Sequence, residues 1–330
     1  MRTSRKLSQI TFVLFALMVM AVSALAADPG AAYPATSEVS DQKAGSLLVY
    51  NIYTSAASGG NTQNTRINIT NTSVTTGANV HLFFVSSDCS IADSYICLTP
   101  AQTASFLASD VDPGVRGYIV GISVDDNGCP VSNNFLIGDE YVKFATGHAA
   151  NLGAEAFAAI GAIACDPNAP SANLDFSGAA GGYNRLPRVL AVSNFPSRAD
   201  GNDTMLIINR IGGNYSTGAS TTGVLFGNLY DDGEQPFSFS IGGACQVLNS
   251  LSDSFPRTTP RLSVIVPAGR SGWLKLYNQG ADAGILGAAI NFNSAASSQA
   301  NAFNGGRNLH KLTLTATTNT ITVPIFPPSC

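Results

Sequence analysis

A stretch of this chain repeats, without a gap, 167 residues further along the sequence. The run from Pro100 to Leu107 aligns with the run from Pro267 to Leu274, so that proline meets proline and an aromatic residue meets Trp273, the only tryptophan. With the same offset, Gly117 to Val120 falls on Gly284 to Gly287. Self-similarity at a fixed spacing indicates that one structural unit occurs more than once. We therefore expect one β module that the chain uses twice.

Alternation of apolar and polar residues predicts β-strands in both halves. Ile67 and Ile69 alternate with polar residues in the run from Thr65 to Asn71, and a similar run extends from Thr204 to Asn209. Short β-branched runs bounded by Gly, Asn and Ser are typical of all-β sandwiches and barrels. Each half offers seven or eight such runs, the number that an immunoglobulin-like sandwich needs.

The strand runs divide the chain into four parts that follow a leader sequence. We predict an extended segment at residues 27–45, a β-sandwich domain at 46–165, a Gly/Pro/Asn-rich linker at 166–187 and a second β-sandwich domain at 188–330. Gly147 to Ile160 is rich in alanine, so we expect a short helical or loop insertion there in the first domain. Phe106 and Trp273 are expected at the centres of the two cores.

The two modules resemble the immunoglobulin-like sandwiches that are common in exported bacterial surface proteins. The resemblance depends on the strand count and on the Thr-x-Ile-x-Ile-Thr-Asn run at residues 65–71. It also depends on a turn that reads Pro-Ala-Gln from Pro100 and Pro-Ala-Gly from Pro267. It implies an all-β fold of two tandem immunoglobulin-like domains. It carries over no functional residues.

The first 26 residues predict a cleaved signal peptide. Arg2, Arg5 and Lys6 form a basic start, an apolar run follows from Ile10 to Val22, and Ala24-Leu25-Ala26 offers the small residues that a signal peptidase accepts. The apolar run is short for a membrane span, which needs about 20 residues. We therefore expect export, with secretion or the cell surface as the destination and the periplasm as the other compartment.

The charge of the mature chain argues against nucleic acid as a partner. The leader holds three of the 17 basic residues, which leaves 14 basic against 21 acidic residues and a net charge of −7. Proteins that bind nucleic acid cluster Lys and Arg to neutralise phosphates. Only 12% of the chain is charged, so its surface must consist largely of uncharged polar residues, which can lose water at a contact at low cost.

An even number of cysteines in an exported chain predicts disulfides. The three pairs that we favour are Cys89 with Cys97, Cys129 with Cys165, and Cys245 with Cys330. Six cysteines allow 15 connectivities, and the sequence cannot choose among them. A metal site is the alternative, but Cys-x-x-Cys spacing is absent, so no metal or other cofactor is expected.

Catalytic motifs are lacking, so the sequence predicts no enzyme and no catalytic residues. His148 precedes Glu155 and follows Asp139-Glu140, but nothing in the sequence requires these side chains to converge. The two other histidines, His81 and His310, fall in or beside predicted strands. Two acidic turns, at 125–128 and 231–234, could supply oxygen ligands to Ca²⁺, although plain turns explain them equally well.

Two functions fit these features. The first is an exported, non-enzymatic structural or adhesive protein of the bacterial surface or extracellular matrix. The alternative is a carbohydrate-binding protein, with or without glycan hydrolase activity, which would bind sugars through exposed aromatic residues on a sheet face. The candidates for that face are Tyr50, Tyr53, Tyr183 and Tyr215.

The predicted partners are a cell-surface or glycan partner and further copies of the chain. Residues 28–45 have few large apolar groups, so they could add as an extra strand to a sheet edge of a neighbouring molecule and link copies. The other interpretation is a flexible leader without a partner. Neither nucleic acid nor membrane insertion after signal cleavage is expected.

Overall fold

Strands make up 53% of the computed structural model, which describes residue 29 and residues 39–56, 63–298, 300 and 302–329. The predicted signal peptide and most of the predicted extended segment lie outside these residues. In strand β2 (Asn64–Asn71), every second side chain, including Ile67 and Ile69, is buried. This two-residue period places one face of the strand against a core.

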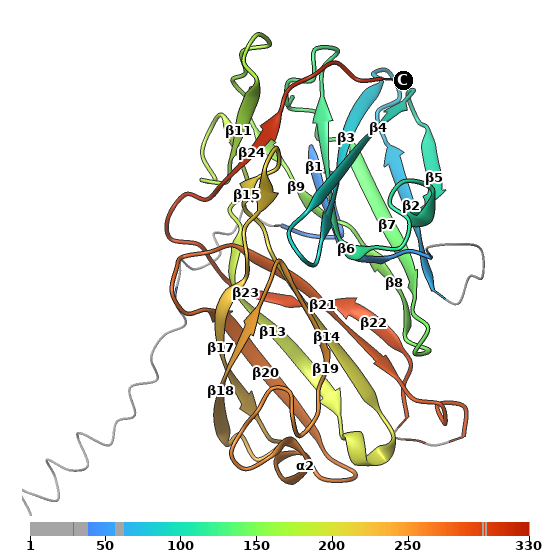
Figure 1. Ribbon diagram of the computed structural model, residues 1–330, viewed down its shortest axis with the longest axis vertical. Helices are drawn as coiled ribbons and strands as arrows, with labels where there is room; N and C mark the ends of the chain where they lie inside the picture. Colours follow the sequence, from blue (N-terminus) through green and yellow to red (C-terminus); the bar gives the residue numbers. More distant parts are fainter. Residues whose placement is uncertain (1–28, 30–38, 57–62, 299, 301, 330) are drawn as a thin grey trace, which may run out of the picture.

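The first nine strands form two antiparallel sheets, which we call the first copy. A five-stranded sheet has the order β4-β3-β6-β1-β9, and a four-stranded sheet has the order β5-β2-β7-β8 (Figure 1). The bounds of the other eight strands are β1 Leu47–Thr54, β3 Ala78–Ser86, β4 Ile91–Leu98, β5 Thr103–Leu107, β6 Arg116–Val124, β7 Leu136–Lys143, β8 Ala149–Gly153 and β9 Glu155–Phe157.

A second set of nine strands repeats this order, and we call it the second copy. Its sheets are β18-β17-β20-β13-β23 and β19-β14-β21-β22, so each strand takes the place of its counterpart in the first copy. The bounds are β13 Pro187–Pro196, β14 Asp203–Arg210, β17 Gly223–Tyr230, β18 Pro236–Gly243, β19 Gln246–Ser250, β20 Ser271–Asn278, β21 Ile285–Phe292, β22 Gly305–Asn308 and β23 His310–Leu314. The four-residue helix α2 (Leu262–Ile265) precedes β20.

The two copies share a β-bulge in their first strand. The pairing of β1 with β6 shifts between Tyr50 and Tyr53, and the pairing of β13 with β20 shifts between Val192 and Phe195. Two residues on each strand are therefore left without a partner in the ladder. Because the bulge lies at the same place in both strands, each residue of β1 can be matched to one residue of β13.

A pair of glycines confirms this correspondence. Gly117 lies opposite Tyr53, and Gly272 lies opposite Phe195, the equivalent position of the second copy. A Cβ atom on Gly117 would stand 1.8 Å from the carbonyl oxygen of Val85, and one on Gly272 would stand 2.9 Å from that of Tyr230. Both positions therefore need glycine because a neighbouring backbone is too close for a side chain.

The gap-free repeat found in the sequence therefore pairs strands that are not equivalent. At an offset of 167 residues, β5 falls on β20, whereas the sheet order makes β6 the counterpart of β20. The alignment matched a proline turn followed by an alternating strand, a pattern that recurs in any all-β chain. The loops between equivalent strands differ in length, so no single offset can align the copies.

The prediction of two tandem immunoglobulin-like sandwiches is wrong. The described strands form five sheets of four or five strands, arranged in a ring in the manner of a five-bladed β-propeller, and one two-stranded sheet. The strand order also excludes the immunoglobulin pattern, in which the first strand lies at a sheet edge. Here β1 pairs with β6 on one side and with β9 on the other.

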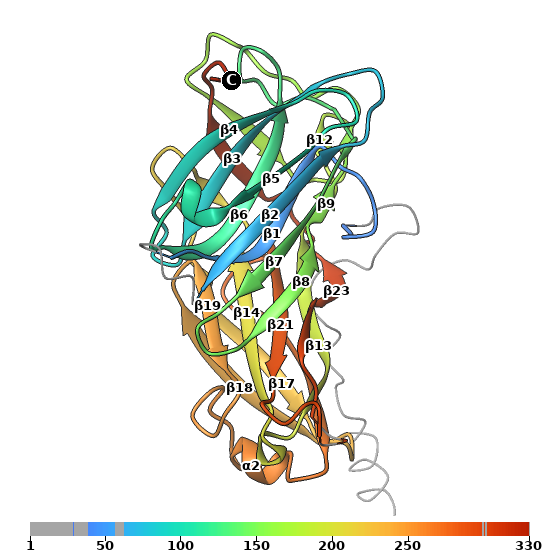
Figure 2. The same cartoon turned by 90° about the vertical axis from the view of Figure 1, so that its right-hand side faces the viewer.

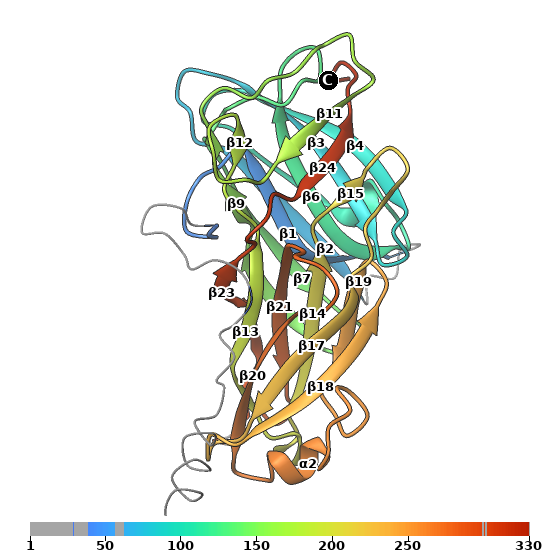
Figure 3. The ribbon, with the colours of Figure 1, turned by 90° about the vertical axis from the view of Figure 1, so that its left-hand side faces the viewer.

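The fifth of these sheets is assembled from three separate parts of the chain. Its order is β11-β24-β15-β16, with bounds β11 Ser171–Asp175, β24 Thr320–Pro324, β15 Gly213–Asn214 and β16 Gly218–Ala219. This sheet lies over the outer face of the five-stranded sheet of the first copy (Figure 3). Residues 166–187, predicted to be a linker, thus carry β11 and also β12 (Gly182–Tyr183), which pairs with β10 (Ala159–Ile160).

The helical or loop insertion predicted at residues 147–160 is also wrong. These residues form β8, β9 and β10, in which Ala150 and Leu152 are buried on one side of β8. Alanine favours helices weakly, and pairing with β7 and β1 outweighs that preference. The segment has counterparts in β22 and β23 of the second copy.

Four hydrophobic clusters hold the sheets together. One lies between the two sheets of each copy, and one joins the first copy to the fifth sheet. The fourth joins the copies, where β7 and β8 pack on β14 and β21 (Figure 2). Phe106 and Trp273 were expected at the core centres. Phe106 is only partly buried at the margin of its core, and Trp273 is partly buried on the outer face of β20, away from the core.

Two disulfides are described. Cys129 with Cys165 confirms one predicted pair. Cys89 bonds to Cys245 across 156 residues, so the predicted pairs Cys89 with Cys97 and Cys245 with Cys330 are wrong. Cys97 is also disulfide-bonded, and Cys330 lies outside the described residues. Because the fold brings the hairpin after β3 beside the start of β19, sequence proximity was a poor guide to pairing.

The described part of the predicted extended segment contacts its own chain. Ser40 pairs with Ala156 of β9, Gly45 pairs with Leu136 of β7, and Val39 is buried in the core under the fifth sheet. Residues 39–45 therefore occupy an edge within the molecule. Addition to a neighbouring molecule stays a prediction for residues outside the described part.

Candidate functional site

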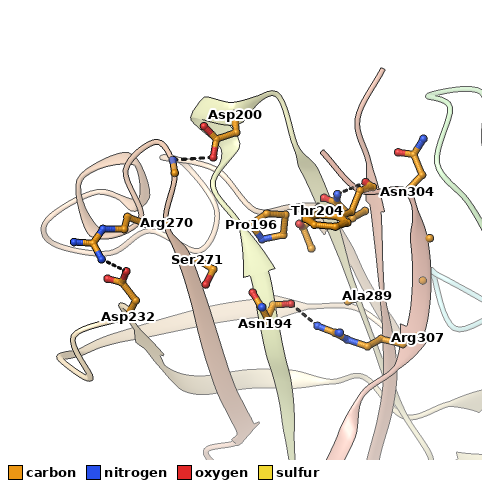
Figure 4. A pocket seen from close by; sticks show the side chains of 15 residues that line it. Asn194, Pro196, Asp200, Thr204, Asp232, Arg270, Ser271, Ala289, Asn304 and Arg307 are labelled. Carbon is orange, nitrogen blue, oxygen red and sulfur yellow. Dashed lines mark hydrogen bonds and ion pairs between the residues drawn. The ribbon is translucent and has the colours of Figure 1, made fainter. Parts of the chain in front are cut away.

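The second copy has a groove at the bulge of β13 (Figure 4). Ser193 and Asn194 have no partner in β20, and β23 pairs only with the part of β13 that precedes them. The end of β13 is thus an uncovered edge. A cavity of about 680 Å³ lies over this edge, and its lining includes Asn194, Thr204, Arg270, Ser271, Asn304 and Arg307.

One wall of the groove is built from acidic and basic side chains. Arg270, directly before β20, forms an ion pair with Asp232 in the β17–β18 turn, with 2.5 Å between Nη1 and Oδ2. Asp200 accepts a hydrogen bond of 2.9 Å from the backbone N–H of Gly269. Figure 4 shows these groups on the same side of β13. Both arrangements leave a second carboxylate oxygen available to a ligand.

The opposite wall is strand β22. The guanidinium of Arg307 donates a hydrogen bond to the backbone carbonyl of Asn194 and so spans the groove from one wall to the bulge. Among the described residues, no carboxylate pairs with Arg307. No ion pair with a described residue therefore neutralises its guanidinium, and the acidic wall of the groove carries Asp200 and the Asp232 of the Arg270 pair.

The floor and rim supply amide and hydroxyl groups. The Thr204 hydroxyl donates to the Asn291 side chain over 2.8 Å, which fixes the floor. The Asn304 side-chain oxygen accepts from the backbone of Asn293 over 2.6 Å, which leaves its NH₂ group without a partner in the described chain. The side-chain amide of Asn194 likewise makes no hydrogen bond to any described residue. The Asn304 NH₂ group can donate, and the Asn194 amide can both donate and accept.

A row of aromatic residues lies on the outer face of the five-stranded sheet of the second copy. Tyr230 and Trp273, opposite each other on β17 and β20, stack with ring centres 4.1 Å apart and planes 3° apart. Phe226 and Tyr277 form a second pair at 5.7 Å, and the Arg188 guanidinium lies over the Tyr277 ring at the same distance. Tyr230, Trp273, Phe226 and Tyr277 are all partly exposed.

The four tyrosines expected on an exposed sheet face are instead buried. Tyr50, Tyr53 and Tyr183 have no exposed surface, and Tyr215 is 4% exposed. The Tyr50 hydroxyl donates to the carbonyl of Asn68, and the Tyr53 hydroxyl donates to Asp112. Aromatic residues with exposed surface on a sheet face include the row of the preceding paragraph and Tyr141 of β7, and the sequence predicted none of them for this place.

The structure does not bring His148 together with the predicted carboxylates. His148 contacts the Thr146 hydroxyl and the backbone carbonyl of Asp203, so it holds β8 to β14. Glu155 instead pairs with Lys311 at 2.6 Å. Burial raises the pKa of the Glu155 carboxyl, and the Lys311 charge opposes this rise.

Glu140 is buried at the bulge of β1. Its Oε1 accepts a hydrogen bond of 3.2 Å from the backbone N–H of Ile52, and its Oε2 has no partner in the described chain. Burial raises the pKa of the Glu140 carboxyl well above its usual value. Asp139, its neighbour on β7, instead accepts a hydrogen bond from Asn68.

His81 and His310 occupy strand positions. His81 is 1% exposed and lies between Asp93 and Tyr95, with 3.0 Å from its Nε2 to the Asp93 carboxylate. Burial lowers the pKa of the His81 imidazole, and Asp93 opposes this effect. His310 begins β23 and is exposed.

The two acidic turns use their carboxylates to shape the backbone. Asp125 accepts from the N–H groups of Asn127 and Cys129, and Asp231 accepts from those of Gly233 and Gln235, each over 2.9 Å. Among the described residues, no group of three or more His, Cys, Asp or Glu side chains is placed to hold a metal ion. Within the same residues, every helix is too short or too polar to cross a membrane.

Comparisons with known proteins assign no family. No family model matches the chain, and no curated protein matches it. A solved structure described as "A Structural Element that Modulates Proton-Coupled Electron Transfer in Oxalate Decarboxylase" aligns with a TM-score of 0.13 and 8% sequence identity, over 77% of this chain and 69% of that chain. A similarity of this size carries no argument about fold or function.

The groove was missed because its residues come from five separate strands and from the turns between them. One local signal could have indicated it. Strand β13 is apolar from Val189 to Val192, and the polar pair Ser193-Asn194 interrupts it before Phe195. Two polar residues in succession break the period of a strand and indicate a bulge.

Proposed function

We propose that this protein is an exported, non-enzymatic adhesive protein of the bacterial cell surface or extracellular matrix. One observation carries the proposal: the second copy exposes a polar groove and an aromatic sheet face at positions that are covered in the first copy. Two open recognition surfaces on one rigid framework are suited to attachment. The low share of charged residues, 12% of the chain, lowers the cost of removing water from such surfaces.

Export is part of the proposal. The all-β fold and the two disulfides fit an extracellular protein, because disulfides persist in oxidising compartments. The leader at residues 1–26 supports passage across the inner membrane. Non-reducing peptide mapping of secreted material tests this part, with both described bridges expected intact.

Fractionation and a binding assay test the adhesive role. The producing cells are separated into medium, surface and periplasmic fractions, and labelled mature protein is added back to intact cells and to cell-free matrix. We expect the protein in the surface or matrix fraction and saturable rebinding. Protein that stays entirely in the medium and does not rebind contradicts the proposal.

The alternative, a carbohydrate-binding protein, is favoured by the aromatic row on β17 and β20. Proteins bind sugar rings on aromatic side chains, and Tyr230 and Trp273 lie side by side on a sheet face. A glycan array with the mature protein and Trp273→Ala tests this surface. Release of reducing sugar from any bound glycan would add hydrolase activity and would contradict the non-enzymatic part of the first proposal.

A further inference from the structure

The groove of the second copy has an occupied counterpart in the first copy. There, the bulge of β1 and the strands β7 and β8 hold the four-stranded sheet of the second copy. Ile52, Val142 and Leu152 pack against Met205, Ile207, Ala288 and Ile290 in one apolar cluster. This place in the fold is therefore a docking position, and in the first copy the other half of the chain fills it.

The two bulges and the strand registers show which residues correspond. Asn194 takes the place of Ile52, because each is the second unpaired residue of its bulge. Arg307 takes the place of Leu152. Arg307 pairs with Ala289 of β21, Leu152 pairs with Glu140 of β7, and Ala289 and Glu140 occupy the same position in their strands.

Asn291 takes the place of Val142 by the same register of β21 and β7. Three apolar side chains of the first copy, Ile52, Leu152 and Val142, are thus replaced in the second copy by an amide, a guanidinium and a second amide. A docking position with these side chains favours an occupant that offers hydrogen bonds rather than apolar surface.

We propose that the groove of the second copy binds a hydroxyl-rich saccharide segment. The inference rests on the proposed adhesive function, since it names the class of molecule through which adhesion occurs. The volume of about 680 Å³ falls within the range of small-ligand sites, about 300–1,000 Å³. The Asn194 amide, the Asn304 NH₂ group and the Ser271 hydroxyl line the same groove and offer both donors and acceptors, which suits the several hydroxyls of a sugar.

Arg307 adds a preference for acidic sugars. Its guanidinium has no carboxylate partner among the described residues, whereas Arg270 is neutralised by Asp232. A planar guanidinium binds a carboxylate through two parallel hydrogen bonds. We therefore expect a saccharide with uronate groups to bind more tightly than a neutral one of equal length.

Two other occupants fit less well. An extended peptide would need a free strand edge, but Pro196 has no N–H and the Asn194 carbonyl already accepts from Arg307. A second chain would have to present the face of β2 and β7 that corresponds to the docked face of the second copy. That face carries Arg66 and Asp139 in place of Met205 and Ala288, so it lacks the apolar surface that holds the copies together.

Titration of the mature protein with three oligosaccharides tests the proposal. The probes are tetragalacturonate, cellotetraose and chitotetraose, which present carboxylate, hydroxyl and acetamido groups. Asn194→Ile and Arg307→Leu convert the groove to the residues of the first copy, and Arg261→Leu is the matched control outside the groove. We expect each groove variant to lower the affinity for tetragalacturonate at least tenfold, and the control to leave it unchanged.

Several results would overturn the proposal. These are a failure of all three probes to bind, equal binding by the groove variants and the wild type, or a change in oligomeric state of the groove variants in light scattering. The melting temperatures of the variants are recorded in parallel, because unchanged values show that a loss of binding reflects the groove. Surface retention without oligosaccharide binding overturns only this inference, whereas oligosaccharide binding without surface retention overturns the adhesive function and leaves the inference standing.

Discussion

The two copies have the same strand order but differ in what lies on the outer face of the five-stranded sheet. In the first copy, Phe83 and Val120 on that face are fully buried under the fifth sheet. At the equivalent positions of the second copy, Asn228 and Lys275 are partly exposed beside the aromatic row. The same sheet is therefore covered in the first copy and open to solvent in the second. The side chains of its outer face are apolar where it is covered and largely polar or aromatic where it is open.

The largest difference is expected from truncation on this face. Phe83→Ala removes a buried ring and should lower the free energy of unfolding by about 3–5 kcal/mol, the usual cost of such a cavity. Asn228→Ala at the equivalent position should change it by less than about 0.5 kcal/mol. Urea denaturation measures both. Equal effects would contradict the view that only the first face is covered.

The next effect concerns the bond between the copies. Replacing Cys89 and Cys245 together by serine should cost about 2–5 kcal/mol, the usual range for a native disulfide. The Cys129–Cys165 bridge closes a shorter loop, so the same change there should cost less in the chain-entropy account. Calorimetry under non-reducing conditions compares the pairs. A greater loss from the Cys129 pair would show that the copies hold together without the covalent link.

Glu140 distinguishes the two bulges by their response to pH. Its folded-state pKa is raised, so its contribution to stability is fully present below its unfolded pKa, about 4.3, and is lost as the pH rises through the folded value. Glu140→Gln keeps an acceptor for the Ile52 N–H and removes the buried charge. We expect the variant to be more stable than the wild type at neutral and alkaline pH, and the difference to shrink as the pH falls toward 4.

That comparison has its control in the second copy, where Ala289 occupies the position of Glu140. Ala289→Gln places no titratable group in the groove, so it should leave the pH dependence of the wild type unchanged. Melting temperatures from pH 4 to pH 9 measure both variants. A pH profile of Glu140→Gln that parallels the wild type would contradict the assignment.

The smallest effect is expected at the groove wall. Arg270 and Asp232 are exposed by 60% and 36% at their side chains, so water and salt screen their ion pair. Arg270→Ala should cost only about 0.2–1 kcal/mol, less in high salt. Chemical denaturation at two salt concentrations measures it. A loss that does not depend on salt would indicate that the side chain contributes by packing.

The sequence predicts the class of the fold because strand periodicity is a local property. Ile67 and Ile69 alternate with polar neighbours, and both prove to be buried in β2. The sheet arrangement depends on contacts between distant segments, such as β11 with β24, which no local pattern encodes. For the same reason the pairing of Cys89 with Cys245 escaped prediction, while Cys129 with Cys165, only 36 residues apart, did not.

The candidate site shows the same limit more strongly. Aromatic residues could be counted in the sequence, but which of them face outward depends on whether another sheet lies over them. Tyr118 and Trp273 occupy equivalent positions, and the first is buried while the second is partly exposed. Asn194 and Arg307 come together only because β13 bulges beside β22.

The fifth sheet has a consequence for the order in which the molecule is completed. Its strand β24 is made of residues 320–324, yet it covers the first copy, whose strands begin at residue 47. During synthesis, the first copy emerges early and keeps its apolar outer face in contact with water until the last residues arrive. Contacts between such distant segments form slowly. The first half of the chain therefore needs the end of the chain to complete its fold. A chain that stops short of β24 would leave an exposed apolar, aggregation-prone surface on the half that was made first.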